Sequence, residues 1–157
     1  MAELLEALGH WPGALWLQRS GTAYLFVNAA HILGIGLLLG AILPLDLRLA
    51  GLIRSAPLAV LAPFLIRVAA CGLALAVLTG AWLFTVKPVE YAGNPAFLWK
   101  LGLLALALAN IALQHRSAAL ERAVATERLP RRVRGHALAS AGLWLAVLVA
   151  GRWIGFV

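Results

Sequence analysis

The sequence has few charged residues and almost no cysteine, and each shortage excludes a class of protein. Charged residues make up 12% of the 157 residues, hydrophobic residues 63%, and the mean hydropathy is +0.92. Soluble domains carry about 25% charged residues, so water is not the main solvent of this chain. The single cysteine, Cys71, excludes an intrachain disulfide and a metal site made of cysteine alone. Zinc-ligand spacing, phosphate-binding loops, catalytic triads and paired intramembrane carboxylates are also missing, which leaves hydrolases and phosphotransferases without their residues.

The apolar residues are gathered into long blocks that predict membrane spans. They cover residues 24–45, 58–86, 97–114 and 137–156. Each is close to or above the ~20 residues that cross a ~30 Å hydrocarbon layer as a helix. Short connections place each helix beside the next. We therefore expect an all-α integral membrane protein, an antiparallel up-down four-helix bundle over residues 21–157.

The segments outside the spans also carry structural signals. Residues 1–20 begin with acidic residues where a secretion signal would be basic, so we interpret them as mature protein. Their leucines and tryptophans recur at near-helical spacing, which predicts a short interfacial helix. Residues 87–95 contain two prolines and are expected to form a loop. The third helix is expected to continue past the membrane until Pro130.

The net charge of +7 is distributed unevenly, which indicates an orientation rather than nucleic-acid binding. Eight arginines fall in the first and third connections: Arg48, Arg54, Arg116, Arg122, Arg128, Arg131, Arg132 and Arg134. Arg19 and Lys87 are the clear loop cations on the other side. By the positive-inside rule the first and third connections are cytoplasmic, and both termini are extracytoplasmic, in a bacterial inner membrane.

Small residues at regular spacing predict close packing of the spans. The candidate positions are Gly36 and Gly40 in the first span, Gly72, Ala76 and Gly80 in the second, and Gly151 and Gly155 in the fourth. Such spacing lets helix backbones approach one another in lipid.

Polar side chains at membrane depth are costly and are the best functional clues in this sequence. Tyr24, Asn28 and His31 share one face of the first span, and His31 lies ~15 Å from its outer end. Arg67 falls at about the same depth in the second span, so we expect it to meet His31 or to bond core carbonyls. Asp46, at the inner end of the first span, is expected to pair with loop arginines.

The four histidines suggest haem ligands. His115 closes the third span and His136 opens the fourth, so both lie near the cytoplasmic edge, where two imidazoles on facing helices can hold a b-type haem or another metal. Arginines beside them would accept its propionates. His31 would need another partner, and His10, in the outer segment, is the candidate for a second haem.

Lys100 and Arg152 lie near the outer ends of the third and fourth spans. Two interpretations remain open for them. Their side chains extend to the surface, or they form an outward-facing cationic pair that holds a carboxylate or propionate.

Several stretches resemble a family of uncharacterised four-helix bacterial membrane proteins, a domain of unknown function. They are His31–Gly34 with Gly40, Asp46–Gly51, Thr79–Phe84, Asn94–Lys100, Ser140 with Trp144, and Gly151–Ile154. The resemblance covers nearly the whole chain and implies the same bundle. It implies a role for His31, Arg48, Lys100 and Arg152 but brings no established activity, and His136 lies outside its pattern. Bundle size and intramembrane histidines give a looser similarity to four-helix membrane b-type cytochromes and to copper-resistance membrane domains.

Three functions follow as hypotheses. The first is a haem b protein that transfers electrons, linked to quinone or to a redox partner, with ligands among His10, His31, His115 and His136; it would be a membrane oxidoreductase. The second is a small-solute or metal carrier whose polar path includes Asn28, His31, Arg67 and Lys100. The third is an accessory or scaffold subunit, for which homo-oligomerisation is one expectation.

Overall fold

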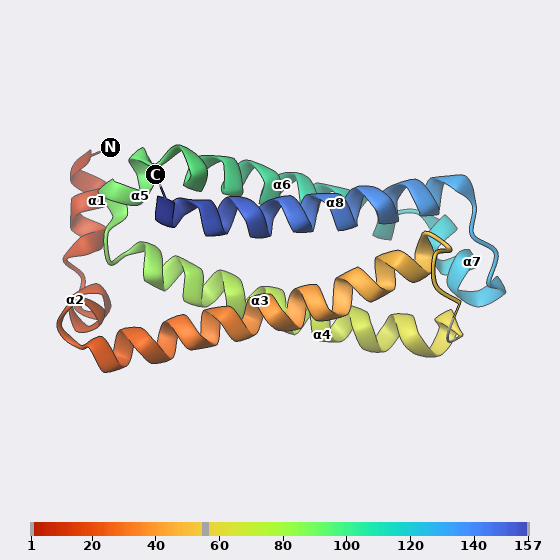
Figure 1. Ribbon diagram of the computed structural model, residues 1–157, viewed down its shortest axis with the longest axis horizontal. Helices are drawn as coiled ribbons and strands as arrows, with labels where there is room; N and C mark the ends of the chain where they lie inside the picture. The colour runs from red at the N-terminus through yellow and green to blue at the C-terminus, as the bar shows by residue number, and fades with distance from the viewer. Residues whose placement is uncertain (1, 55–56, 157) are drawn as a thin grey trace.

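Four long helices form the body of the protein. The computed structural model describes residues 2–54 and 57–156. Among these residues, four helices are long and apolar enough to cross a membrane: α3 (Gly21–Leu49), α4 (Leu58–Phe84), α6 (Pro95–His115) and α8 (Arg131–Trp153). The 3-10 turn η1 (Ile154–Phe156) continues α8. The four long helices run alternately up and down, and both termini lie at the same end (Figure 1). The predicted multi-pass antiparallel bundle is confirmed.

The helices form two layers. α3 packs along α4, and α6 packs along α8 (Figure 1). The layers are joined mainly where α3 packs against α8. α4 and α6 have no comparable packing in the described part of the chain, so one side of the bundle is less tightly closed than the others.

The outer surface of the bundle is apolar. Large side chains such as Phe26, Leu78, Leu106 and Val149 are exposed. An apolar exterior around long helices is what lipid requires, because the hydrocarbon layer solvates these side chains.

The α3–α4 pair is built on two glycines. A Cβ on Gly34 would lie 2.7 Å from the Ala76 nitrogen, and one on Gly72 would lie 2.5 Å from the Leu38 nitrogen. The two backbones therefore approach more closely than any larger residue permits. The expected packing of Gly72 is confirmed. Gly36 and Gly40 are exposed with no such neighbour, so their predicted role in packing within the chain is wrong.

We call the end that carries both termini the terminal end. It is covered by α1 (Ala2–Gly9), α2 (Pro12–Arg19) and the six-residue α5 (Pro88–Gly93). The single predicted N-terminal helix is thus two helices, because Pro12 begins a new one, and the predicted loop over residues 87–95 contains a helical turn.

Trp82 fastens α2 to the terminal end of the bundle. Its Nε1 donates to the Gly13 carbonyl oxygen at 3.1 Å, and its ring stacks on Trp16 with centroids 5.8 Å apart. Gln18 adds two bonds, to the carbonyl oxygens of Gly9 and Val86.

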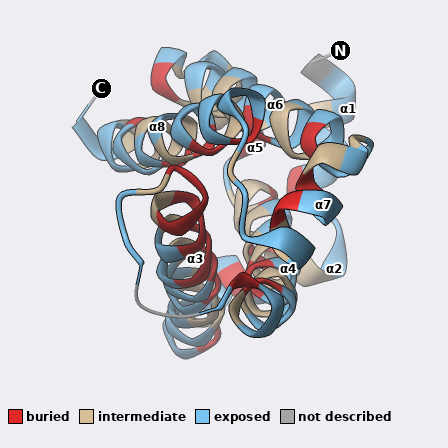
Figure 2. Cartoon of the chain, turned by 90° about the vertical axis from the view of Figure 1, so that its right-hand side faces the viewer, coloured by how far each residue is buried: buried red, intermediate tan, exposed pale blue. Residues whose placement is uncertain are grey.

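We call the opposite end the basic end, because it carries the eight loop arginines. It is crossed by α7 (Ala118–Thr126), which packs against α4, α6 and α8 (Figure 2). The prediction that the third helix continues to Pro130 is therefore wrong. α6 ends at His115, and the Ser117 hydroxyl accepts a hydrogen bond from the Ala119 nitrogen to start a separate helix.

Candidate functional site

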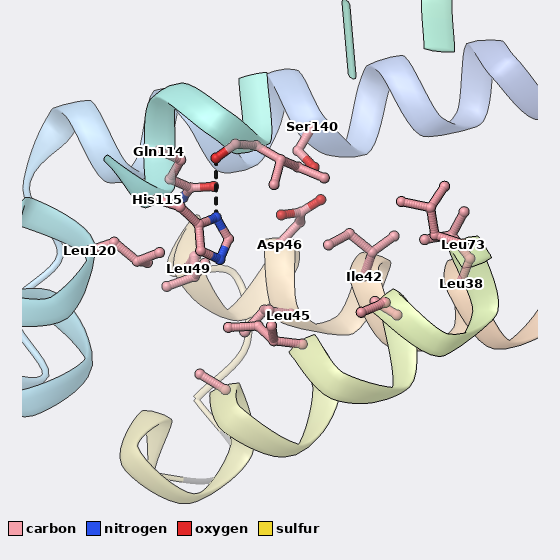
Figure 3. Close-up of a pocket in the computed structure, with 15 residues that line it drawn as sticks. Leu38, Ile42, Leu45, Asp46, Leu49, Leu73, Gln114, His115, Leu120 and Ser140 are labelled. Atoms are coloured by element: carbon pink, nitrogen blue, oxygen red, sulfur yellow. Dashed lines mark hydrogen bonds between the residues drawn. The ribbon is translucent and has the colours of Figure 1, made fainter. Parts of the chain in front are cut away.

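A cavity lies inside the basic half of the bundle. Its volume is about 240 Å³. α3, α4 and α6 supply most of the wall, mainly with leucine, isoleucine and alanine, while α7 supplies Leu120 and α8 supplies Ser140 (Figure 3). Every long helix and the short helix at the basic end thus contribute to its lining.

Three polar side chains interrupt this apolar wall. Asp46 is 2% exposed, Gln114 6% and Ser140 1%. The Asp46 carboxyl group points toward Ser140 across the cavity (Figure 3). Asp46 Oδ2, Gln114 Nε2 and Ser140 Oγ have no hydrogen-bond partner among the described residues. An unmet buried polar group costs about 1–3 kcal/mol, so the cavity favours a polar group that can bond these atoms. Asp46 and Ser140 also face each other closely enough to interact.

Trp144 adds a fourth unmet polar group beside the cavity. Its ring is 2% exposed and packs with Leu38 and Ile42, which belong to the cavity wall. Its Nε1 has no acceptor among the described residues. A buried tryptophan usually finds an acceptor, so this donor is a further unmet polar group in the core next to the cavity.

Both α4 and α6 line the cavity, and these two helices are not packed along each other in the described part of the chain. At the terminal end these helices are bridged by aromatic rings, with Phe84 stacked on Phe97 at 5.3 Å and Tyr91 beside both. Burial, together with Tyr24, raises the pKa of Tyr91, so its hydroxyl stays protonated at neutral pH. Toward the basic end no such bridge occurs among the described residues, and the cavity fills the space there.

His31 occupies a separate position in the terminal half. Its Nδ1 lies 3.1 Å from Thr79 Oγ1, whose own proton is donated to the Leu75 carbonyl at 2.6 Å. Thr79 must therefore accept from His31, which makes Nδ1 the protonated nitrogen and leaves Nε2 with a lone pair. The ring lies against Gly80, where a Cβ would be 2.9 Å from Cε1.

Arg67 does not meet His31. Arg67 is exposed on α4, twelve residues before Thr79, a separation of about 18 Å along the helix. The prediction that Arg67 and His31 meet assumes that equal depth, counted from the ends of the two spans, means equal height in the bundle. The Gly34–Gly72 crossing sets the actual register and places His31 beside the last turns of α4.

His115 and His136 have different partners. His136 Nδ1 is 2.7 Å from Asn110 Oδ1, whereas His115 is exposed and its Nδ1 bonds the Ile111 carbonyl oxygen within its own helix. His115 lies at the rim of the cavity (Figure 3). Although both histidines lie toward the basic end, as expected, the structure does not pair their rings.

His10 lies at the terminal end, in the turn between α1 and α2. It is exposed, and its Nδ1 bonds the Glu6 carbonyl oxygen. In the described part of the chain no group of three or more His, Cys, Asp or Glu side chains is arranged to hold a metal ion.

The side chains of Lys100 and Arg152 lie in different environments. Lys100 is half-buried and its side chain lies along Gly151 of α8. Arg152 is exposed and its guanidinium covers the Phe156 ring at 4.6 Å. Lys100 therefore belongs to the interior, and Arg152 to the surface.

The sequence did not predict the cavity, although Asp46 and Ser140 stand in the stretches that carry the family resemblance. Asp46 was expected to pair with loop arginines, but the ion pair of Arg48 is with Glu127, and Asp46 faces inward. Ser140 sits among apolar residues, and Gln114 stands beside His115 and Arg116 at the end of its span. The depth of Ser140 in its span was the one available signal, because a polar side chain at that depth usually faces the bundle interior.

Fold and cavity together define a class: a four-helix membrane-spanning protein with a ligand-sized, partly polar cavity in one half of the bundle. The chain belongs to a family of unknown function (DUF6644), whose model matches residues 12–157. The resemblance seen in the sequence is thereby confirmed, while the looser similarity to b-type cytochromes receives no support. No curated protein and no solved structure matches the chain.

Proposed function

We propose that this protein binds the head group of a lipid-soluble quinone in the cavity and takes part in membrane electron transfer. The observation that carries the proposal is the set of unmet polar atoms on Asp46, Gln114 and Ser140 in an otherwise apolar cavity. A quinone is a mainly apolar molecule with polar groups at opposite ends of its ring, and it matches that lining.

The size of the cavity agrees with a substituted ring. Cavities of about 150 Å³ accept benzene, and this one measures about 240 Å³. The isoprenoid tail requires an exit into lipid, and we place it on the α4–α6 side, where the two helices are not packed along each other in the described part of the chain. The ring would then be held in the bundle and the tail in the bilayer.

The polar groups suit both redox states of the ligand. The Gln114 amide and the Ser140 hydroxyl can donate to a quinone carbonyl oxygen. The Asp46 carboxyl oxygen can accept a proton or a hydrogen bond from a quinol hydroxyl. His115, exposed at the rim, adds an imidazole that can donate or accept a hydrogen bond there.

The charge pattern supports a location in the bacterial inner membrane with the basic end in the cytoplasm. The eight loop arginines all belong to the end that also carries the cavity. The cavity then opens toward the cytoplasmic leaflet, and the termini are extracytoplasmic.

Mass spectrometry of bound lipids tests the proposal. The protein is purified in a mild detergent, extracted with organic solvent and assayed for quinones. We expect stoichiometric quinone in the wild type and little in Asp46→Leu or Gln114→Leu. Glu121→Gln, which removes a carboxylate from the exposed face of α7, is the matched control and should retain it.

Asp46→Leu also separates loss of ligand from loss of fold. Replacing an unpaired buried carboxyl group with leucine of similar size should leave the melting temperature unchanged or raised. A quinone-free wild type isolated from quinone-replete cells would refute the proposal.

Haem b on His31 is a second candidate, and one observation favours it. The Nδ1–H of His31 is fixed by Thr79, which leaves Nε2 as the metal-binding nitrogen, the arrangement that metal-ligating histidines share. A second axial histidine is not found beside His31 among the described residues, so the haem would have one histidine ligand.

Visible spectra of the oxidised and dithionite-reduced protein test the haem. A Soret band with reduced α and β bands that is lost in His31→Ala, but kept in His10→Ala, is the expected result. A colourless, folded preparation from haem-replete cells contradicts it and leaves the quinone proposal untouched.

A further inference from the structure

Glu127 joins three parts of the basic end through one carboxylate. It follows α7 directly, its Oε2 forms an ion pair with Arg48 at the end of α3, and its Oε1 accepts a hydrogen bond from the Leu58 nitrogen at 2.6 Å. Leu58 is the first residue of α4. The carboxylate therefore holds α7 onto the ends of both helices of the α3–α4 layer.

The backbone of Glu127 is strained. Its φ of 58° is in the left-handed region, where no other non-glycine residue is found in the described part of the chain. A side chain there costs energy that the surrounding bonds must offset. The two carboxylate bonds are the ones that Glu127 itself supplies, so this conformation depends on them.

The same helix covers the cavity. Leu120 of α7 lines the cavity, and Ala123 of α7 belongs to a buried apolar cluster with Leu45 and Leu58. α7 contacts both α4 and α6, the two long helices that are not packed along each other (Figure 2). It is tethered by short connections, residues 116–117 and 127–130. It is thus the element between the cavity and the aqueous phase at the basic end.

We infer that α7 is a lid over the cavity and that the Glu127 carboxylate is the latch that keeps it closed. This inference rests on the cavity being the functional site named above. Breaking the latch releases the connection at residues 127–130, and α7 moves away from α4. The cavity, with Asp46 and Ser140, is then open to water and to a soluble redox partner or a proton donor.

Cysteine accessibility tests the lid without any ligand. Cys71 is replaced by alanine, and Ser140→Cys places a thiol of nearly the same size on the cavity wall. The protein in nanodiscs is treated with a charged, membrane-impermeant maleimide. Glu127→Gln removes the charge of the latch, and Glu127→Gly removes the carboxylate at a backbone conformation that glycine adopts freely.

We expect both Glu127 variants to speed labelling of Ser140→Cys by about tenfold or more, since a hydrogen bond to a charged group holds the closed state. Glu121→Gln on the same helix should leave the rate unchanged. A second reporter, Ala107→Cys, lies in the buried core outside the cavity wall and should stay unlabelled in every variant.

Two results overturn the lid. One is an unchanged labelling rate at Ser140→Cys in both Glu127 variants. The other is a parallel rise at Ala107→Cys, which would make Glu127 a general stabilising residue. Because no quinone is used, failure of the lid and failure of the quinone proposal are distinguishable.

Discussion

Asn110 of α6 and His136 of α8 are joined by two hydrogen bonds. His136 Nδ1 lies 2.7 Å from Asn110 Oδ1, and Asn110 Nδ2 donates to the main-chain carbonyl oxygen of His136 at 3.0 Å. The second bond fixes which amide atom faces the ring, so Nδ1 carries the proton. The pair sets the register of α6 against α8 near the cavity.

Loss of this pair should destabilise the bundle. Asn110→Leu leaves the His136 Nδ1–H without an acceptor in a half-buried position, which costs about 1–2 kcal/mol. We expect the melting temperature in detergent to fall by about 2–4 °C for each kcal/mol. Ala109→Leu, at an exposed neighbouring position, should melt as the wild type does. Equal melting temperatures for the two variants would show that the pair contributes nothing.

The Gly72 crossing should tolerate no larger side chain. In Gly72→Val the new Cβ would lie 2.5 Å from the Leu38 nitrogen, so α3 and α4 must separate. We expect aggregation or a broadened profile in fluorescence-detected size-exclusion chromatography. Gly36→Val, on an open face of α3, is the control and should elute normally. A normal profile for Gly72→Val would contradict the close crossing.

Trp82 should hold the N-terminal helices to the bundle. Trp82→Phe removes the hydrogen bond to Gly13 and part of the stacking on Trp16. We expect faster amide hydrogen exchange over residues 12–19, measured by mass spectrometry, with little change in the four spans. Trp99→Phe changes a residue that is 72% exposed and should leave exchange unaltered.

The orientation is testable with single cysteines in Cys71→Ala protein. Gly93→Cys is exposed at the terminal end, and Ser117→Cys lies at the basic end. In intact cells whose outer membrane is permeable, an impermeant maleimide should label position 93 at once. Position 117 should react only after lysis, and the opposite pattern would invert the topology.

Much of the fold could be predicted from the sequence because span length and charge distribution depend on local composition. The boundaries of the helices at the terminal end and the end of α6 are harder to predict, because each is set by a single residue. Pro12 begins α2, and the Ser117 cap begins α7. The sequence gives the depth of a residue along its own span, but it does not give the register between neighbouring helices. The Gly34–Gly72 contact sets that register and separates Arg67 from His31.

The cavity could not be predicted because it depends on rotation of each helix about its axis. Asp46, Gln114 and Ser140 are separated by 68 and 26 residues along the chain and converge only in the assembled bundle. A hydropathy pattern does not give that rotation when lipid-facing and buried side chains are both apolar. Histidine chemistry favours a haem site, whereas the unmet polar atoms lie on Asp46, Gln114, Ser140 and Trp144.

Direct binding of a quinone to the cavity is the most decisive measurement. Wild-type protein freed of lipid and placed in nanodiscs is titrated with decylubiquinone, with empty nanodiscs giving the background partition. We predict saturable binding with one site per chain. Gln114→Leu and Asp46→Leu should weaken it by about tenfold or more, because each removes one polar partner of the ring. Binding indistinguishable from empty nanodiscs, or equal in wild type and both cavity variants, would contradict the account.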